Sequence, residues 1–191
     1  GEIKLHGRPV HFRHTGEAIA NKIGLIPENR KTQGLVQILP VWENMTMVAL
    51  DKCKKNGVIN YGVIRETCEL YKKSLNVKTP SINTVIQNLS GGNQQKVIIA
   101  KWLFRDCDIL LIDEPTQGID VMVKEEIYKI IRNLADEGKS MIVVSSELDE
   151  LLRICDNIIV MFDGKEVMTS SKENFNPDKI LSVSVTGRNE S

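Results

Sequence analysis

Short apolar runs alternate with longer amphipathic segments over most of the chain. The apolar runs that predict strands cover residues 23–26, 109–112, 141–146 and 157–162. The segments whose apolar residues recur at helical spacing cover residues 94–105, 121–137 and 147–154. The wholly apolar run 109–112 is typical of a central parallel strand that is buried on both faces. Strands that alternate with helices predict an α/β fold built on a parallel sheet.

Turn signals mark both ends of the chain and the region after the first apolar run. Residues 2–12 predict a hairpin, and the turn at 163–164 leads from the last apolar run into a final short strand. Thr15 is placed to cap a short helix that runs to residue 22. The stretch 28–40, which is rich in charged residues, Gln and Gly, predicts a loop.

The pattern changes in the middle of the chain, where helical spacing replaces the apolar runs. Residues 61–75 predict a helix that ends at the turn of Thr79 and Pro80. We therefore predict a helical subdomain over residues 41–92, inserted into a core formed by residues 1–40 and 93–191.

The length and composition of the chain argue against a nucleic-acid-binding protein and against a membrane-spanning protein. The 191 residues suffice for one domain with a real core. The 25 basic residues balance 25 acidic ones, so we expect no basic face of the size that nucleic acid demands. No apolar run approaches the ~18 residues of a membrane span. The cysteines are widely spaced, without a Cys-x-x-Cys pair, which indicates free thiols in a reducing cytoplasm; they are Cys53, Cys68, Cys107 and Cys155.

Two carboxylates, Asp113 and Glu114, directly follow the apolar run 109–112. Ligands of parallel sheets bind at the carboxyl ends of the strands, and carboxylates there are costly to desolvate unless they meet a cation or a polarised water. One could hold Mg²⁺, and the other could orient or deprotonate an attacking water. The alternative is an acidic turn at a strand end, helped by Pro115, and this motif alone does not decide between the two.

A second motif, Ser90-Gly91-Gly92, opens a predicted helix. Unpaired N–H groups and the helix dipole favour a phosphate at such a position, and the serine hydroxyl adds a donor. The alternative is an ordinary helix cap, because serine and glycine are common there and in turns.

The order of the motifs along the chain is more specific than either motif alone. LSGGNQQK (89–96) precedes ILLIDEP (109–115), which is followed by TQGID (116–120). This set resembles the signature loop, the Walker B strand and the D-loop of the nucleotide-binding cassette of ABC transporters. Together with NVKTPS and VSSEL, it is most similar to the second cassette of sugar-importer ATP-binding subunits of the ribose, xylose and galactose type. The resemblance runs from residue 1 to about residue 183.

The resemblance implies a P-loop NTPase-like fold and a role for each motif residue. Glu114 would be the catalytic base or water-orienting group for ATP hydrolysis, and Asp113 would serve Mg²⁺. Asp120 would transmit closure between the two ATP sites of a cassette pair. The signature-loop residues expected to complete the ATP site of the opposite cassette are Ser90, Gly91, Gly92 and Gln94.

Two positions depart from the commonest pattern of that family. Glu28 stands where the Q-loop glutamine contacts the metal, the water and the membrane subunit, and a carboxylate could still do so. Ser146 stands at the position of the switch histidine, and serine can hydrogen-bond but cannot carry a positive charge near the γ-phosphate. Both replacements suit weak or asymmetric hydrolysis at this cassette's own site; ordinary loop residues are the alternative.

The phosphate loop of the family has no counterpart in the 191 residues. No G-x-x-x-x-G-K-[ST] run occurs, and the nearest spacing, between Gly57 and Gly62, continues with Val63. Residues 1–3 resemble the segment that follows the phosphate-loop helix, so we expect the chain to begin just after it and to lack the Walker A strand, loop and helix. We then expect the isolated chain to be inactive toward ATP and to self-associate through bare strand edges.

The resemblance implies a part in ATP-driven carbohydrate uptake, on the cytoplasmic face of the cell membrane. The implied partners are a second cassette, permease subunits that touch residues 28–60, and, indirectly, a periplasmic or lipoprotein sugar-binding protein. A truncated, non-catalytic cassette that only docks on partner subunits is the alternative. A DNA-repair ATPase of the SMC type would need flanking coiled-coil heptads and a basic surface, and the sequence has neither.

Overall fold

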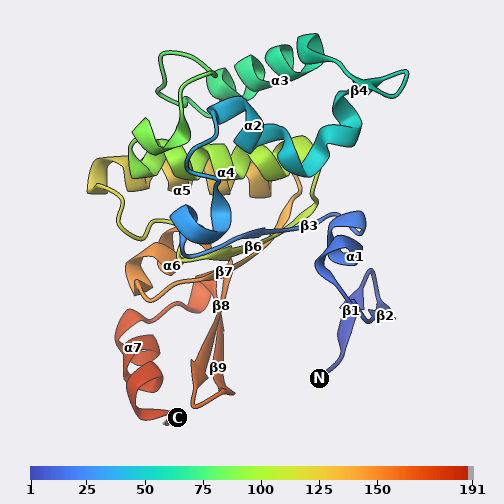
Figure 1. Ribbon diagram of the computed structural model, residues 1–191. Coiled ribbons are helices and arrows are strands. Elements are labelled where there is room, and N and C mark those ends of the chain that lie inside the picture. Colours follow the sequence, from blue (N-terminus) through green and yellow to red (C-terminus); the bar gives the residue numbers. More distant parts are fainter. Residues whose placement is uncertain (189–191) are drawn as a thin grey trace.

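A three-stranded parallel sheet lies at the centre of the computed structural model, which describes residues 1–188 (Figure 1). Its strands, in spatial order, are β3 (Ile23–Ile26), β6 (Ile109–Asp113) and β7 (Ser140–Val144). Leu111 of β6 pairs with Leu25 on one side and with Ile142 on the other. The predicted parallel sheet and the central place of the 109–112 run are confirmed. The predicted burial of this run on both faces is wrong, because Ile109 and Leu111 are only partly buried.

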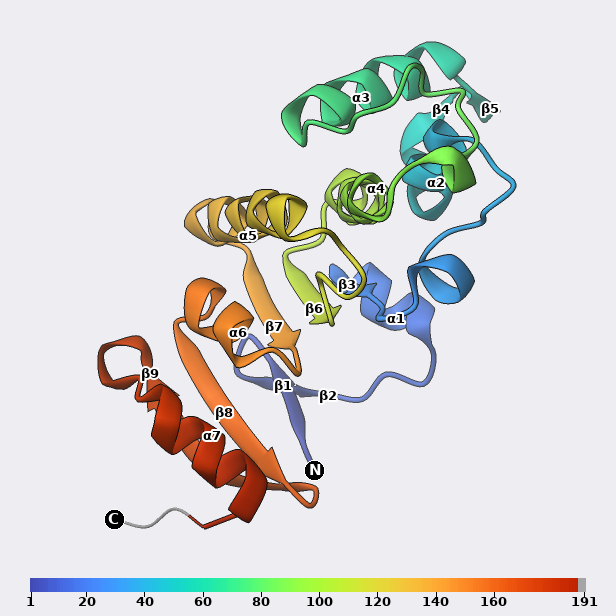
Figure 2. The same cartoon turned by 90° about the vertical axis from the view of Figure 1, so that its left-hand side faces the viewer.

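Two long helices, α4 (Gly91–Arg105) and α5 (Val121–Asp136), lie along one face of this sheet (Figures 1 and 2). Gly24 of β3 allows the close approach of α4, because a Cβ there would lie 2.8 Å from the ring of Trp102. Ile112 projects toward the same helices and is buried. The apolar stripes of both helices therefore form the core together with the inner face of the sheet.

The opposite face of the sheet is apolar and open to solvent. Leu25, Ile142 and Val144 are 50%, 61% and 58% exposed. Within residues 1–188, β7 pairs only with β6, so its other edge presents unpaired backbone groups. The bare strand edge expected from the sequence is present in this part of the chain.

A helical layer lies beyond α4 (Figure 2). Its elements are α2 (Val41–Thr46), the 3₁₀ segments Met47–Cys53 and Ile86–Asn88, the hairpin of β4 (Lys54–Lys55) and β5 (Val58–Ile59), and α3 (Tyr61–Ser74). The helix predicted over 61–75 is confirmed to within one residue, and it ends before the turn predicted at Thr79 and Pro80. Asn76 adopts a left-handed φ of 50°, which ends the helix earlier.

The N-terminal segment contains the predicted hairpin and helix. β1 (Ile3–Leu5) and β2 (Arg8–Val10) are antiparallel, and α1 (Thr15–Ala20) follows them. The prediction of Thr15 as the helix cap is wrong, because Thr15 already has helical geometry and His14 is the capping residue. Within the predicted loop 28–40, Arg30–Gly34 forms one turn of π-helix.

The C-terminal part forms a separate small layer (Figure 2). Its elements are α6 (Leu148–Ile154), β8 (Asn157–Phe162), β9 (Lys165–Ser171), the 3₁₀ turn Lys172–Asn174 and α7 (Pro177–Thr186). Within residues 1–188, β8 pairs antiparallel with β9 alone, and α7 packs on it. The parallel sheet predicted from alternating strands and helices therefore does not extend to β8 in this part of the chain.

Candidate functional site

The residues predicted to serve catalysis and metal binding converge at one edge of the parallel sheet. Asp113 ends β6, Glu114 follows it, Glu28 lies just beyond β3, and Ser146 lies just beyond β7. The carboxyl ends of parallel strands meet at the same edge. The topology thus gathers residues that are far apart in the sequence.

Glu114 makes the most specific contacts of this group. Its N–H donates to the carbonyl of Val144 at 2.9 Å, and its Oε1 accepts the N–H of Ser146 at 2.7 Å. The backbone of Glu114 has a φ of 45°, a left-handed conformation that a non-glycine residue seldom adopts and that is concentrated at functional sites. The carboxylate is therefore fixed against the loop after β7.

Asp113 and Glu28 supply the oxygen donors that Mg²⁺ prefers. Within residues 1–188, no three His, Cys, Asp or Glu side chains gather into an all-protein metal site. Mg²⁺ at nucleotide sites is usually held by one or two carboxylates together with phosphate oxygens and water. A half-buried aspartate at the end of β6 and an exposed glutamate just beyond the neighbouring strand β3 carry oxygens of that kind.

The signature loop forms the N-terminus of α4. Ser90 is the exposed capping residue, its side chain does not cap the helix, and its Oγ accepts a hydrogen bond from Asn93 Nδ2 at 2.9 Å. Asn93 Oδ1 in turn accepts the N–H of Lys78 at 2.7 Å. These two hydrogen bonds hold the start of α4, a helix of 15 residues, in place. The first N–H groups of the helix have no partner within it and can bind an anion.

Gln94 lies in the first turn of α4 and points into the protein. It is 3% exposed, and its Nε2 donates to the carbonyls of Ile86 and Leu89 at 3.2 and 3.1 Å. In this arrangement its amide holds the segment before the signature loop in place.

Asp120 caps α5 with its backbone in an extended conformation, and its side chain is exposed. Gly118, two residues earlier, has a φ of 63°, which glycine adopts without strain. The turn that joins β6 to α5 therefore projects Asp120 outward beside the signature loop.

Two polar pairs that the sequence did not predict brace this turn. Thr116 Oγ1 donates to Glu150 Oε1 of α6 at 2.7 Å, and both residues are 1% exposed. Lys124 Nζ lies 2.6 Å from Glu147 Oε1, and this hydrogen bond raises the pKa of Lys124. The pairs tie the turn after β6 and the start of α5 to the segment that follows Ser146.

A third unpredicted cluster joins the loop after β3 to the same turn. Gln117 Nε2 donates to Glu28 Oε1 at 3.0 Å, and Arg30 Nη1 donates to the carbonyl of Gln117 at 2.7 Å. Arg30 and Gln117 lie in loops, where the sequence has no periodic pattern that predicts contacts. The only sequence signal for this contact is that Arg30 lies close to Glu28 and Gln117 lies next to Gly118.

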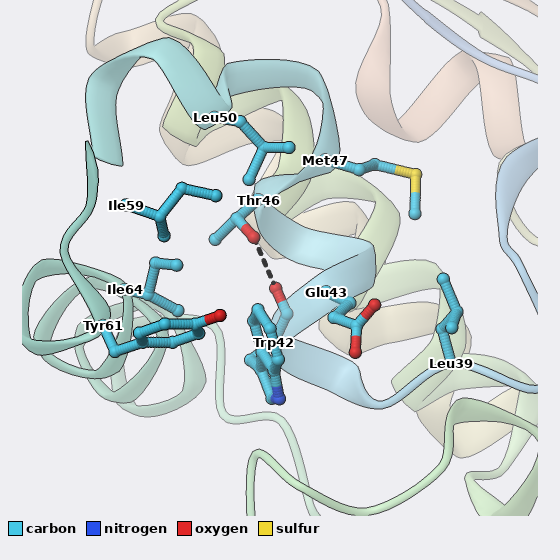
Figure 3. A pocket seen from close by; sticks show the side chains of 9 residues that line it. All are labelled: Leu39, Trp42, Glu43, Thr46, Met47, Leu50, Ile59, Tyr61 and Ile64. Atoms are coloured by element: carbon cyan, nitrogen blue, oxygen red, sulfur yellow. Dashed lines mark hydrogen bonds between the residues drawn. The ribbon is translucent and has the colours of Figure 1, made fainter. Parts of the chain in front are cut away.

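A mostly apolar hollow of about 190 Å³ opens in the helical layer (Figure 3). The rings of Trp42 and Tyr61 meet edge to face in it, with 6.1 Å between their centroids. Thr46 Oγ1 donates to the carbonyl of Trp42 at 2.9 Å, which leaves the threonine methyl group to the hollow. Its remaining lining residues are Leu39, Glu43, Met47, Leu50, Ile59 and Ile64.

The family profile and the similar curated proteins all point to the same protein family. The family profile described as ABC transporter matches residues 1–117. A putative ribose/galactose/methyl galactoside import ATP-binding protein of Halalkalibacterium halodurans is 45% identical over 181 residues, which are 95% of this chain and 35% of that protein. The arabinose import ATP-binding protein of Vibrio parahaemolyticus is 43% identical over 191 residues, which are 100% of this chain and 38% of that protein. The chain thus spans little more than a third of the length of these curated relatives.

Solved structures agree on the fold. An ATP-binding cassette determined as a dimer in a post-hydrolysis state, bound to ADP and Pi, has a TM-score of 0.75 at 23% identity. The match covers 92% of this chain and 75% of that one. A second cassette, in its ADP conformation, has a TM-score of 0.73 at 19% identity, with 97% and 73% of the two chains covered. Among the described helices, none has the length and apolar character that crossing a membrane requires.

Proposed function

The chain belongs to the ABC transporter family and has the fold of its ATP-binding cassettes, and from that premise we propose that it is part of a sugar-importer ATP-binding subunit. In the native protein it would couple ATP hydrolysis to carbohydrate uptake at the inner face of the cell membrane. The printed functions of the relatives, import of ribose, galactose, methyl galactoside and arabinose, support this substrate class.

The contact between Glu114 and Ser146 carries the proposal. A carboxylate at the end of a central parallel strand, held by the N–H of Ser146 at 2.7 Å, is placed to orient or deprotonate a water. Asp113, with Glu28 nearby, would hold Mg²⁺, which supplies charge neutralisation to the phosphates when bound. Ser146 contributes a backbone donor to Glu114 here, so a neutral side chain at that position does not disrupt the pair.

The signature loop would serve the ATP of a second cassette. Ser90, Gly91 and Gly92 would offer N–H and hydroxyl donors to its γ-phosphate, and Gln94 would keep the loop in shape from within. Asp120 lies beside this loop and would transmit the closure of the cassette pair from one ATP site to the other. The dimeric state of the first solved cassette above is consistent with such an arrangement.

The permease would contact the segment from residue 28 to residue 60. This segment contains the exposed Glu28 and most of the hollow around Trp42, and Val36 and Ile38 in it are 41% and 76% exposed. Apolar side chains around a hollow suit the insertion of a protein anchor. A sugar-binding protein would act only through the permease.

The chain alone would neither bind ATP tightly nor hydrolyse it, because its 191 residues contain no phosphate-loop motif. The open face beside β7 supports a second proposal, that isolated chains associate with one another. A docking role without turnover remains the alternative function, and the same open face favours it.

The decisive experiment reconstitutes the native protein in vesicles with its permease and its sugar-binding protein. Sugar-stimulated phosphate release and uptake would be measured with ribose, galactose, methyl galactoside and arabinose. We expect at least one sugar to raise both rates together. ATP hydrolysis that responds to none of them, or no hydrolysis at all, would contradict the sugar-importer assignment and favour the docking role.

A further inference from the structure

The side chain of Arg30 lies where three segments of the candidate site meet. Its Nη1 donates to the carbonyl of Gln117 at 2.7 Å. A Cβ built at Gly91 would lie 3.2 Å from Nη2, and one built at Gly118 would lie 3.8 Å from it. The guanidinium therefore fills the space between the turn before α5 and the first residue of α4.

The loop that carries Arg30 is itself anchored. Asn29 Oδ1 accepts the N–H of Thr32 at 3.1 Å, and Lys101 Nζ of α4 donates to the carbonyl of Gly34 at 2.7 Å. The Gln117 amide adds its hydrogen bond to Glu28. Arg30 thus projects from a braced single turn of helix and not from a free loop.

The position of Arg30 is not explained by helix stability. A positive charge near a helix N-terminus opposes the helix dipole. Burial lowers the pKa of Arg30. None of the ion pairs within residues 1–188 includes this arginine, so no opposite charge compensates for that burial. The guanidinium is a planar group that donates a hydrogen bond to the turn at residue 117 and packs against Gly91 at the start of α4.

We infer that Arg30 is a positioning residue, which fixes the spacing between the turn at residues 117–118 and the N-terminus of α4. Movements of the loop after β3 would pass through this side chain to the signature loop and to the turn that carries Asp120. The inference rests on the proposed function, because that function assigns the loop after β3 to the permease and the signature loop to ATP.

Shape as well as charge is required at this position. Arginine directs several donors from one plane, whereas lysine is a compact charge on a flexible stem. Lysine at position 30 could reach the carbonyl of Gln117 or lie against Gly91, but it would not span both. Arg30→Lys should therefore behave like Arg30→Met and not like the wild type.

The test uses the native protein assembled with its permease and compares Arg30→Met and Arg30→Lys with the wild type. Arg65→Met is the matched control, because Arg65 is exposed on α3. Hydrogen exchange of the hydrogen-bonded amides of Gln94, Gln117 and Ile119, which report on the two segments, is one readout. Sugar-stimulated ATP hydrolysis, with its KM for ATP, is the other.

We expect both Arg30 variants to speed exchange in these two segments by roughly tenfold or more, as loss of a hydrogen bond to a charged group allows. Stimulation should fall by a similar factor, while the KM for ATP shifts by less than about twofold. Gln117→Ala should keep the protection of the Gln94 amide, because the acceptor of Arg30 is the backbone carbonyl of residue 117.

Wild-type behaviour of Arg30→Lys would overturn the inference, as would faster exchange spread evenly over α4. A wild type without ATP hydrolysis would contradict the proposed function instead. The exchange comparison would then still decide whether Arg30 holds the two segments together.

Discussion

Val123 leaves no room for a side chain at position 92: a Cβ built on Gly92 would overlap its Cγ1 atom and lie 3.5 Å from Ile119. The second glycine of the signature loop is therefore required for packing of α4 against the start of α5, apart from any contact with phosphate.

Replacement of Gly92 by alanine should destabilise the chain. Overpacking of a close contact usually costs about 1–3 kcal/mol, because neighbouring side chains and backbone must shift. The double variant Gly92→Ala/Val123→Ala should regain most of the loss relative to Val123→Ala alone, which chemical unfolding can measure. Equal costs of Gly92→Ala in both backgrounds would mean that Val123 is not the obstacle.

Glu114→Gln in the native protein should lower ATP hydrolysis at this cassette's own site by about 10²- to 10⁴-fold while ATP binding persists. The glutamine oxygen can still accept the N–H of Ser146, so the loop geometry should survive and only the basic carboxylate is lost. Single-site turnover and nucleotide binding, measured together, provide the check. Glu137→Gln is the control, since Glu137 is exposed beyond the end of α5, and unchanged turnover in Glu114→Gln would refute the role.

The strongly patterned parts of this molecule could be predicted from its sequence. The wholly apolar run 109–112 predicted a central strand, and β6 does lie at the centre of the sheet, although only its face toward α4 and α5 is fully buried. Asp113 and Glu114 were found because a strand end fixes their position, and Ser90 because a helix start does.

The rest depended on tertiary contacts that leave no periodic trace. Arg30, Gln117 and the buried Thr116–Glu150 pair join segments far apart in the chain. The left-handed Asn76, which follows the end of α3, was not anticipated, because the sequence signal for the turn lay at the later proline. The inward direction of Gln94 depends on two carbonyls that only the folded loop brings within reach.

Isolated chains should associate in a concentration-dependent manner through β7. Its free edge within residues 1–188 and the exposed Ile142 and Val144 form a flat apolar strand of the kind that pairs with another chain. Ile142→Lys should shift sedimentation toward monomer. Val121→Lys, a substitution at an exposed position on α5, should not. A wild-type chain that sediments as a monomer at every concentration would rule this out.

The isolated chain should show ATP binding weaker than millimolar and no steady phosphate release. Charge-assisted bonds of a phosphate loop contribute roughly 1.5–3 kcal/mol each, and millimolar to micromolar affinity corresponds to only about 4–8 kcal/mol. The signature loop offers few donors by comparison. Titration calorimetry with Mg-ATP tests this, and micromolar affinity would mean that the chain holds a phosphate site elsewhere.

Lys101 should make the chain more stable as the pH rises from about 8 toward 10.5. Burial lowers the pKa of Lys101 from 10.5 to about 8, while its Nζ donates to the carbonyl of Gly34. Between these values the unfolded chain binds more protons than the folded one, so raising the pH favours folding. The penalty for burying the charge is complete below the folded pKa and disappears above the unfolded one.

The free energy of unfolding should rise by ~1.4 kcal/mol for each unit by which the folded and unfolded pKa values of Lys101 differ. This amounts to roughly 3 kcal/mol over the whole pH window. Subtracting the unfolding free energy of Lys101→Met from that of the wild type cancels the other titrating groups. This difference should grow between about pH 8 and pH 10. The same subtraction with Lys129→Met, at an exposed position on α5, should stay flat. A flat difference for Lys101→Met as well would show that water or a shift of the loop at Gly34 already relieves the buried charge.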